Sequence, residues 1–236
     1  MSGPLPADLL AAFRRCAAGL TGLDEAAYAA AGRDPQEPVI GLGPPTAPVA
    51  FFGRDPGREE LVHGVPFIGA GGRQVRGVLH RRRHGTALAG TEQAIAAGAD
   101  YFWANTVPYK PFGNKAWSMA VKRRFQPLVA RLLLAAWQGR HVITLGREAF
   151  LWFGLGQPPA TRQRLAAHWA DPERFGTSVS LDYGLEGVGS RRLCLHPLPH
   201  PSPLNATWYR RFPGLLEARL DALEAAPTRA AGGGLS

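Results

Sequence analysis

The 236-residue chain carries 27 Lys and Arg against 18 Asp and Glu, a net charge of +9, and 45% of its residues are hydrophobic. This composition is typical of a globular protein, and the absence of a long apolar run excludes a membrane-spanning one. The first residues lack the basic and apolar regions of a secretory signal, so a cytoplasmic protein is expected. A sequence pI of about 10.4 favours a polyanionic partner, nucleic acid ahead of a membrane surface.

The two cysteines, Cys16 and Cys194, lie near opposite ends of the chain, and no CxxC motif is present. A four-thiolate zinc or iron–sulfur site therefore cannot be built from this chain alone. The length fits one domain over residues 1–226, followed by a disordered tail at 227–236. We expect a monomer that needs neither a metal nor a cofactor.

Apolar residues at helical spacing predict a helix over residues 7–20 and a second one near 24–31. After a stretch rich in Pro and Gly, the apolar run 49–52 predicts a buried strand that ends in a tight turn. Residues 72–83 then predict a helix. Its arginines, Arg73 and Arg76 among them, are expected to face outward.

The alternation of strand and helix is repeated three more times along the chain. Strands are predicted at 101–104, 141–145 and 193–195, with helices after Asn114, from Arg147 and over about 205–225, and residues 157–190 are expected to be irregular. Strands that alternate with helices form parallel sheets covered on both faces. The sequence thus predicts an α/β fold, a three-layer αβα domain with a central, mainly parallel sheet of four strands.

Three polar residues follow three different predicted strands. They are Asp55, Asn105 and His200. In open parallel sheets, ligands bind beyond the carboxyl ends of the strands, where such residues meet. We therefore expect these three side chains to converge at one crevice.

Taken singly, the segments around these residues have ordinary explanations as well as functional ones. Glycines on both sides of Asp55 let the backbone approach a ligand, but they are equally typical of a turn. An Asn amide at position 105 can read the edge of a base or form a turn. His196 and His200 have the spacing of helical metal ligands, but the prolines between and after them exclude the helix that would bring them together.

Together, the segments resemble the uracil-DNA glycosylase superfamily. Residues 53–57 resemble its first motif, and residues 64–69 resemble the segment that supplies an aromatic stacking residue. Residues 200–204 are similar to the final motif in the form of the family 1 enzymes. Asn105 with residues 110–115 resembles the base-reading strand and loop of the iron–sulfur enzymes of family 4. The resemblance spans residues 48–212, with the motifs in the right order.

The chain also departs from these families. Tyr109 stands where the iron–sulfur enzymes have a cysteine ligand, so the resemblance does not imply a cluster, and ordinary packing around Tyr109 is expected instead. Asp55 matches the water-activating carboxylate of family 1. Gly57 replaces the tyrosine that excludes the methyl group of thymine, and Arg54 is unusual at its position. Both differences leave the base specificity open.

The resemblance implies an enzyme of base excision repair that flips uracil or another deaminated base out of DNA and hydrolyses its N-glycosidic bond. Asp55 would orient water and His200 would hydrogen-bond the departing base. Base-binding residues would be Phe67, Asn105, Arg54 and Gly57. DNA contacts are expected from Leu204, which would enter the duplex, and from Ser202, Gly53, Gly69, Gly71, Lys110, Arg81 and Arg82.

Three alternatives remain open at this point. The first is a glycosylase that acts mainly on hypoxanthine or xanthine. The second is a non-catalytic or covalent binder of damaged DNA. The third is a nucleotide hydrolase that uses the glycine loop 69–72, although no Lys-Ser/Thr pair follows that loop.

Overall fold

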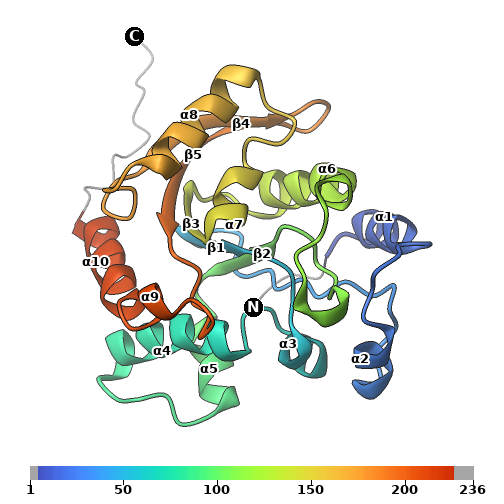
Figure 1. Ribbon diagram of the computed structural model, residues 1–236, viewed down its shortest axis with the longest axis horizontal. Helices are drawn as coiled ribbons and strands as arrows, with labels where there is room; N and C mark the ends of the chain where they lie inside the picture. Colours follow the sequence, from blue (N-terminus) through green and yellow to red (C-terminus); the bar gives the residue numbers. More distant parts are fainter. Residues whose placement is uncertain (1–4, 226–236) are drawn as a thin grey trace.

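The computed structural model describes residues 5–225, so the tail expected at 227–236 lies outside the described residues. One sheet of five strands, in the order β2-β1-β3-β5-β4, forms the centre of a single α/β domain (Figure 1). The strands are β1 (Val49–Gly53), β2 (Phe102–Asn105), β3 (His141–Leu145), β4 (Val179–Leu185) and β5 (Gly189–Leu198). All neighbouring strands are parallel except β4, which runs antiparallel to β5. The four parallel strands are those that the sequence predicts.

The prediction of a four-stranded sheet is wrong by one strand, because β4 lies in the region expected to be irregular. This strand is at the edge of the sheet, and it buries Val179, Leu181 and Tyr183 while Asp182 faces solvent. Its alternation of apolar and polar residues is the pattern of a half-buried strand. β5 is longer than expected because its first half pairs with β4 in a hairpin, whose turn contains Gly187 at φ +74°.

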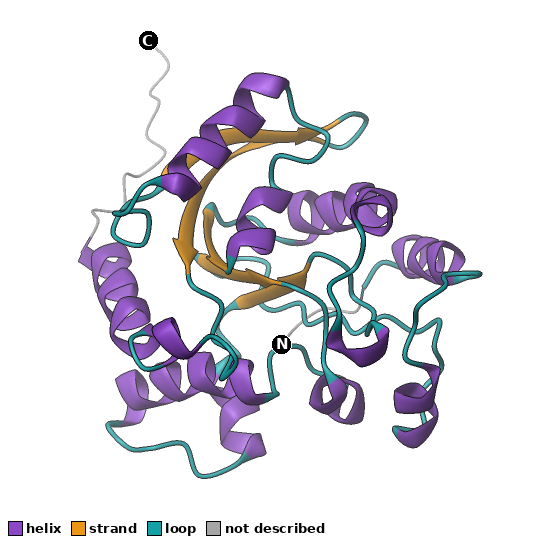
Figure 2. Ribbon diagram, in the orientation of Figure 1, coloured by secondary structure: helices purple, strands orange, loops and turns teal. Residues whose placement is uncertain are grey.

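Helices cover both faces of the sheet (Figure 2). One face packs against α1 (Ala7–Ala17), α6 (Met119–Ala136), α7 (Arg147–Trp152) and α8 (Pro159–Ala170), and the other against α4 (Ala70–His84), α5 (Thr91–Ala97) and α10 (Phe212–Ala225). Short helices α2 (Glu25–Ala30), α3 (Arg58–His63), η1 (Phe112–Asn114) and α9 (Ala206–Tyr209) lie in the connections. This is the three-layer arrangement that the sequence predicts.

The apolar run in β1 shows why both faces are covered. Successive side chains of a strand point to opposite faces, so Phe51 and Phe52 enter different cores, and both are fully buried. Phe51 stacks on Trp103 with ring centroids 4.7 Å apart, and Phe52 packs at 4.8 Å from Trp152. A strand with two buried faces needs apolar residues at every position, which explains the lack of alternation in its sequence.

Tyr109 lies in a closely packed aromatic wall between α1, α6 and the segment after β2. The ring is fully buried, 5.3 Å from the ring of Phe125, and its hydroxyl donates to the Gln36 carbonyl at 3.0 Å. Trp117 donates its indole N–H to the Tyr109 carbonyl at 2.8 Å. Aromatic packing and these hydrogen bonds therefore stabilise the region around Tyr109, as the sequence predicts.

Candidate active site

The carboxyl ends of the parallel strands open into a cavity of about 640 Å³. Its walls are the loop after β1, the start of α4, the end of β2 and the segment after β5. Asp55, Asn105 and His200 all line this cavity. The structure thus brings together the three residues that the topology predicts to meet.

Asp55 is half-buried and presents one carboxylate oxygen without a protein partner. Its Oδ1 accepts a hydrogen bond from the Thr106 hydroxyl at 3.1 Å, whereas its Oδ2 is buried and has no hydrogen-bond partner within residues 5–225. Burial raises the pKa of Asp55 to about 6, against the opposing influence of the charges on Arg54 and Lys122. At neutral pH the group is a carboxylate whose basicity exceeds that of an ordinary Asp.

Asn105 ends β2 with its amide held in one orientation. The side chain is 5% exposed, and its Nδ2 donates to the Arg54 carbonyl. Its Oδ1 is buried without a hydrogen-bond partner among the described residues. Buried polar atoms are nearly always satisfied in proteins, so this oxygen lacks the donor that such an atom normally has.

Phe67 stands on the cavity wall in a backbone conformation that L-residues seldom adopt. Within residues 5–225 it is the one residue other than glycine with a positive φ, +57°. Its ring packs 5.3 Å from Trp103 and against Gly53, where a Cβ would lie 2.4 Å from the ring. A Cβ on Gly72 would lie 2.0 Å from the Phe67 carbonyl carbon. Both glycines are required by this close packing.

Arg76 is buried in α4 and hydrogen-bonds the backbone of the Phe67 loop. The prediction that Arg76 faces outward is therefore wrong. Arg76 is 2% exposed, and it donates to the carbonyls of Phe67 at 2.7 Å and of Pro66 at 3.0 Å. Its guanidinium group lies 4.2 Å from the centroid of the Trp103 ring. Burial lowers the pKa of Arg76 to about 10, so the group is still charged at neutral pH.

Glu60 joins the two loops of the pocket. One carboxylate oxygen accepts from the backbone N–H groups of Ile68 at 3.1 Å and Gly69 at 2.9 Å, and the other accepts from Gly57 at 2.9 Å. The residue is 8% exposed. Sequence reasoning missed its role, although a Glu three residues after the N-cap of a helix is a recognisable capping position.

His200 lies opposite these loops as a neutral imidazole. Burial and the charge on Arg54 lower the pKa of His200 to about 4. Gly146, at φ +93°, allows this approach, since a Cβ there would lie 3.0 Å from the His200 Cβ. A neutral ring of this kind can donate one hydrogen bond without adding a charge to the site.

The segment after His200 presents a large apolar side chain, Leu204, to solvent. Leu204 is 97% exposed, the highest value among the large hydrophobic residues described. Its backbone N–H donates to the Ser202 hydroxyl at 3.3 Å, and the Asn205 amide donates to the His200 carbonyl at 3.1 Å. Leu204 and Ser202 both line the cavity mouth.

The predicted DNA-binding residues fall into two groups. Gly53, Gly69 and Gly71 line the cavity, and a Cβ on Gly71 would lie 2.7 Å from the Pro201 carbonyl, so close packing already accounts for this glycine. The basic residues are engaged elsewhere. Lys110 is 2% exposed and pairs with Asp24 at 2.8 Å.

Arg81 and Arg82 lie in α4, away from the cavity lining. Arg81 pairs with Glu217 at 3.0 Å, and Arg82 pairs with Asp221 at 2.6 Å and Glu224 at 3.0 Å. These acids belong to α10, so the arginines join two helices of the fold. The structure does not place them beside the other candidate DNA contacts.

Comparison with known proteins agrees with this geometry. A sequence model described as the uracil DNA glycosylase superfamily matches residues 40–224, a range that includes every residue of the cavity. A search among curated proteins finds no match. Along residues 5–225, no helix combines the length and apolar character needed to cross a bilayer. The chain belongs to the uracil-DNA glycosylase superfamily, whose members are DNA glycosylases that act on damaged bases.

Proposed function

We propose that this protein hydrolyses the N-glycosidic bond of uracil, or of another deaminated base, in DNA and leaves an abasic site. One observation carries the proposal. Two buried acceptor atoms, Asp55 Oδ2 and Asn105 Oδ1, lie in the lining of one cavity without partners among the described residues. A base and a water molecule that enter this cavity would supply the missing donors.

Base recognition rests on Asn105 and Phe67. The Asn105 Oδ1 accepts the imide N–H that uracil carries, while cytosine presents a lone pair at the same ring position and is rejected. Phe67 offers a ring face on which the flipped base stacks. Since Arg76 and Glu60 fix both ends of the Phe67 loop, the stacking surface is in place before DNA binds.

The chemistry rests on Asp55 and His200. Breaking an N-glycosidic bond builds positive charge on the sugar and negative charge on the departing base. The Asp55 carboxylate stabilises the sugar cation and orients the attacking water. The neutral His200 ring donates a hydrogen bond to the base oxygen where negative charge develops.

The exposed Leu204 completes the proposal. Extruding a base from the stack costs a few kcal/mol, and an apolar side chain that fills the gap offsets part of this cost. Leu204 stands at the cavity mouth on a segment stiffened by prolines at 201 and 203. We propose that it enters the duplex, that Ser202 contacts a flanking phosphate, and that the protein acts as a monomer in the cytoplasm.

The test is a panel of labelled oligonucleotides that carry uracil, hypoxanthine, xanthine or a thymine mismatch, each single- and double-stranded. We expect free uracil and an abasic site from the uracil substrates. His200→Asn should lower the rate about 100-fold, with duplex binding unchanged. Turnover of no substrate, or a heat-stable protein–DNA adduct in place of free base, would contradict the proposal.

A wider base specificity has one observation in its favour. Gly57 places no side chain in the cavity, and a Cβ there would lie 2.7 Å from the Glu60 carboxylate. The pocket therefore lacks the gate that would exclude a larger base. Hypoxanthine, which also carries a ring N–H next to a carbonyl, is the second candidate substrate, and release of hypoxanthine faster than uracil in the same panel would establish it.

A further inference from the structure

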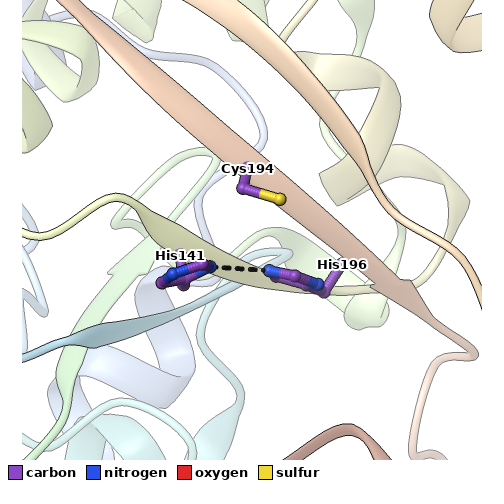
Figure 3. Close-up of side chains that lie close together, drawn as sticks. All are labelled: His141, Cys194 and His196. Carbon is purple, nitrogen blue, oxygen red and sulfur yellow. Dashed lines mark hydrogen bonds between the residues drawn. The ribbon is translucent and has the colours of Figure 1, made fainter. Parts of the chain in front are cut away.

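A second group of chemically active side chains lies outside the cavity lining, on strands β3 and β5. His141 is the first residue of β3, and Cys194 and His196 belong to β5 (Figure 3). The ligand atoms of these residues all lie within 4.8 Å of one another. In the part of the chain that the structure describes, this is the one group of three such residues.

The strand register explains why the three side chains meet. β3 and β5 are parallel, with His141 opposite Cys194 and Ile143 opposite His196. Because alternate residues of a strand share a face, all three side chains project from the same side of the sheet. His141 is four residues and His196 two residues before the level of Leu145, which lines the cavity, so along the strands the two rings lie about 13 Å and about 7 Å from it.

The two imidazole rings are arranged as ligands that face one another. His141 Nδ1 and His196 Nε2 are 3.0 Å apart, which allows at most one hydrogen between them and leaves at least one lone pair directed inward. His196 is 4% exposed, whereas His141 and Cys194 are half-buried. The group is thus open to solvent at His141 and Cys194 and enclosed by protein at His196.

We propose that His141, Cys194 and His196 bind a single Zn²⁺ ion. Zinc takes imidazole nitrogen at about 2.0–2.1 Å and thiolate sulfur at about 2.3 Å, so tetrahedral ligand atoms lie roughly 3.3–3.6 Å apart. The ring nitrogens already have nearly this separation. Rotation of the half-buried Cys194 side chain brings its sulfur within reach, and its thiol proton passes to solvent on binding.

The surroundings show what must change when the ion binds. The exposed Arg140 donates from Nε to His141 Nε2 at 3.2 Å, so it must turn away to let this nitrogen carry the ring hydrogen while Nδ1 binds the metal. Arg219 of α10 is 8% exposed, and its guanidinium group is held by the carbonyls of Phe175 and Thr177. Three protein ligands leave a fourth position for water or a small anion.

The test uses the untagged full-length protein, freed of metal with a chelator and titrated with Co²⁺. We expect one equivalent of Co²⁺ to produce tetrahedral absorption bands and a thiolate-to-cobalt charge-transfer band, and Zn²⁺ to abolish both. Cys194→Ser should lose the charge-transfer band, whereas Cys16→Ser, which removes the other thiol, should retain it. His141→Ala should compete at least tenfold less well than wild type for Zn²⁺ against a chromophoric chelator.

The outcomes separate this proposal from the glycosylase activity, because none of the measurements uses DNA. Addition of Zn²⁺ should raise the melting temperature of wild type and Cys16→Ser but not of Cys194→Ser. A wild-type protein without a charge-transfer band, or a band that persists in Cys194→Ser, would overturn the zinc site. If Cys194→Ser does not fold, the His141→Ala variant decides the question. An unchanged affinity of His141→Ala for zinc would also overturn the zinc site.

Discussion

The two halves of the cavity are built in different ways. The pocket half, residues 53–69, is tied together by the buried charges of Glu60 and Arg76, which hydrogen-bond its backbone at several points. The wedge half, residues 200–205, has two side-chain hydrogen bonds, and its most prominent side chain, Leu204, is almost fully exposed. Its stiffness comes from prolines, which need no partners.

The proposed function accounts for this difference. To read a base, the pocket half would have to hold Phe67 within about 0.5 Å of its working position, and buried hydrogen bonds supply that precision. The wedge half would enter a duplex that deforms as the base leaves, so a fixed network around it would oppose the movement. The pocket half should therefore respond to substitution in both stability and activity, and the wedge half in activity alone.

The largest effect is expected from Asp55→Asn in the pocket. Loss of the carboxylate should lower the rate of base release by about 100- to 1,000-fold in single-turnover assays. The same variant should be more stable by about 2–3 kcal/mol at neutral pH, because the pKa of Asp55 is raised from 3.8 to about 6 and its charge is destabilising. Asp182→Asn, which changes an exposed acid on β4, serves as the control and should change neither quantity.

The pH dependence gives an independent check on Asp55. The wild-type rate should fall about tenfold per pH unit below pH 6 and level off above it, because only the carboxylate form is active. His200, with a pKa of about 4, stays neutral down to about pH 5. The stability advantage of Asp55→Asn should be absent below about pH 3, where the folded and unfolded states of the wild type are both protonated, and should grow to its full size above about pH 6. A low-pH decrease in rate that persists in Asp55→Asn would show that another group controls it.

Arg76→Met should produce the largest loss of stability. The substitution keeps the apolar stem but leaves the carbonyls of Phe67, Pro66 and Ala94 without a donor, at a cost of about 2–4 kcal/mol in urea unfolding. The strained backbone of Phe67 is then free to relax, so KM should rise as well. Arg81→Met is the matched control on the same helix. Arg81 is exposed and pairs with Glu217 of α10, not with the Phe67 loop, so its loss should cost less than 1 kcal/mol.

The burial of Arg76 could not be predicted from the sequence. Arg76 stands in a helix with many arginines, and helical spacing alone favours a solvent-facing position for a charged residue. What buries it is a tertiary requirement, the unpaired carbonyls of a loop up to ten residues earlier. The polar residues of the cavity were predictable because strand ends meet at one edge of a parallel sheet, a rule that needs only the order of the strands.

The two features missed in the sheet have related causes. β4 buries one face only, and a short alternation of apolar and polar residues does not by itself distinguish an edge strand from an irregular segment. His141 and His196 are 55 residues apart, and their contact depends on the register between β3 and β5. Register is set by packing across the whole sheet, and no local pattern in the sequence indicates it.

Glu60→Gln should have a smaller effect than Arg76→Met in the same half of the site. The amide keeps one acceptor oxygen for Ile68 and Gly69 but turns a donor toward the backbone N–H of Gly57. We expect a loss of about 1–2 kcal/mol in stability and a KM several-fold higher. Glu59→Gln, at the exposed neighbouring position, is the control. An unchanged KM would mean that the two loops keep their positions without the Glu60 bridge.

Leu204→Ala tests the wedge half, where the smallest effect on the protein itself is expected. Because the side chain is 97% exposed, its removal should change the stability by less than 0.5 kcal/mol. The rate on uracil in a duplex should fall about tenfold, since the gap left by the flipped base is no longer filled. The rate on single-stranded uracil should be unchanged, because no stack has to be broken. Equal losses on the two substrates would show that Leu204 contributes to the pocket, and the two halves of the cavity would then not be separable.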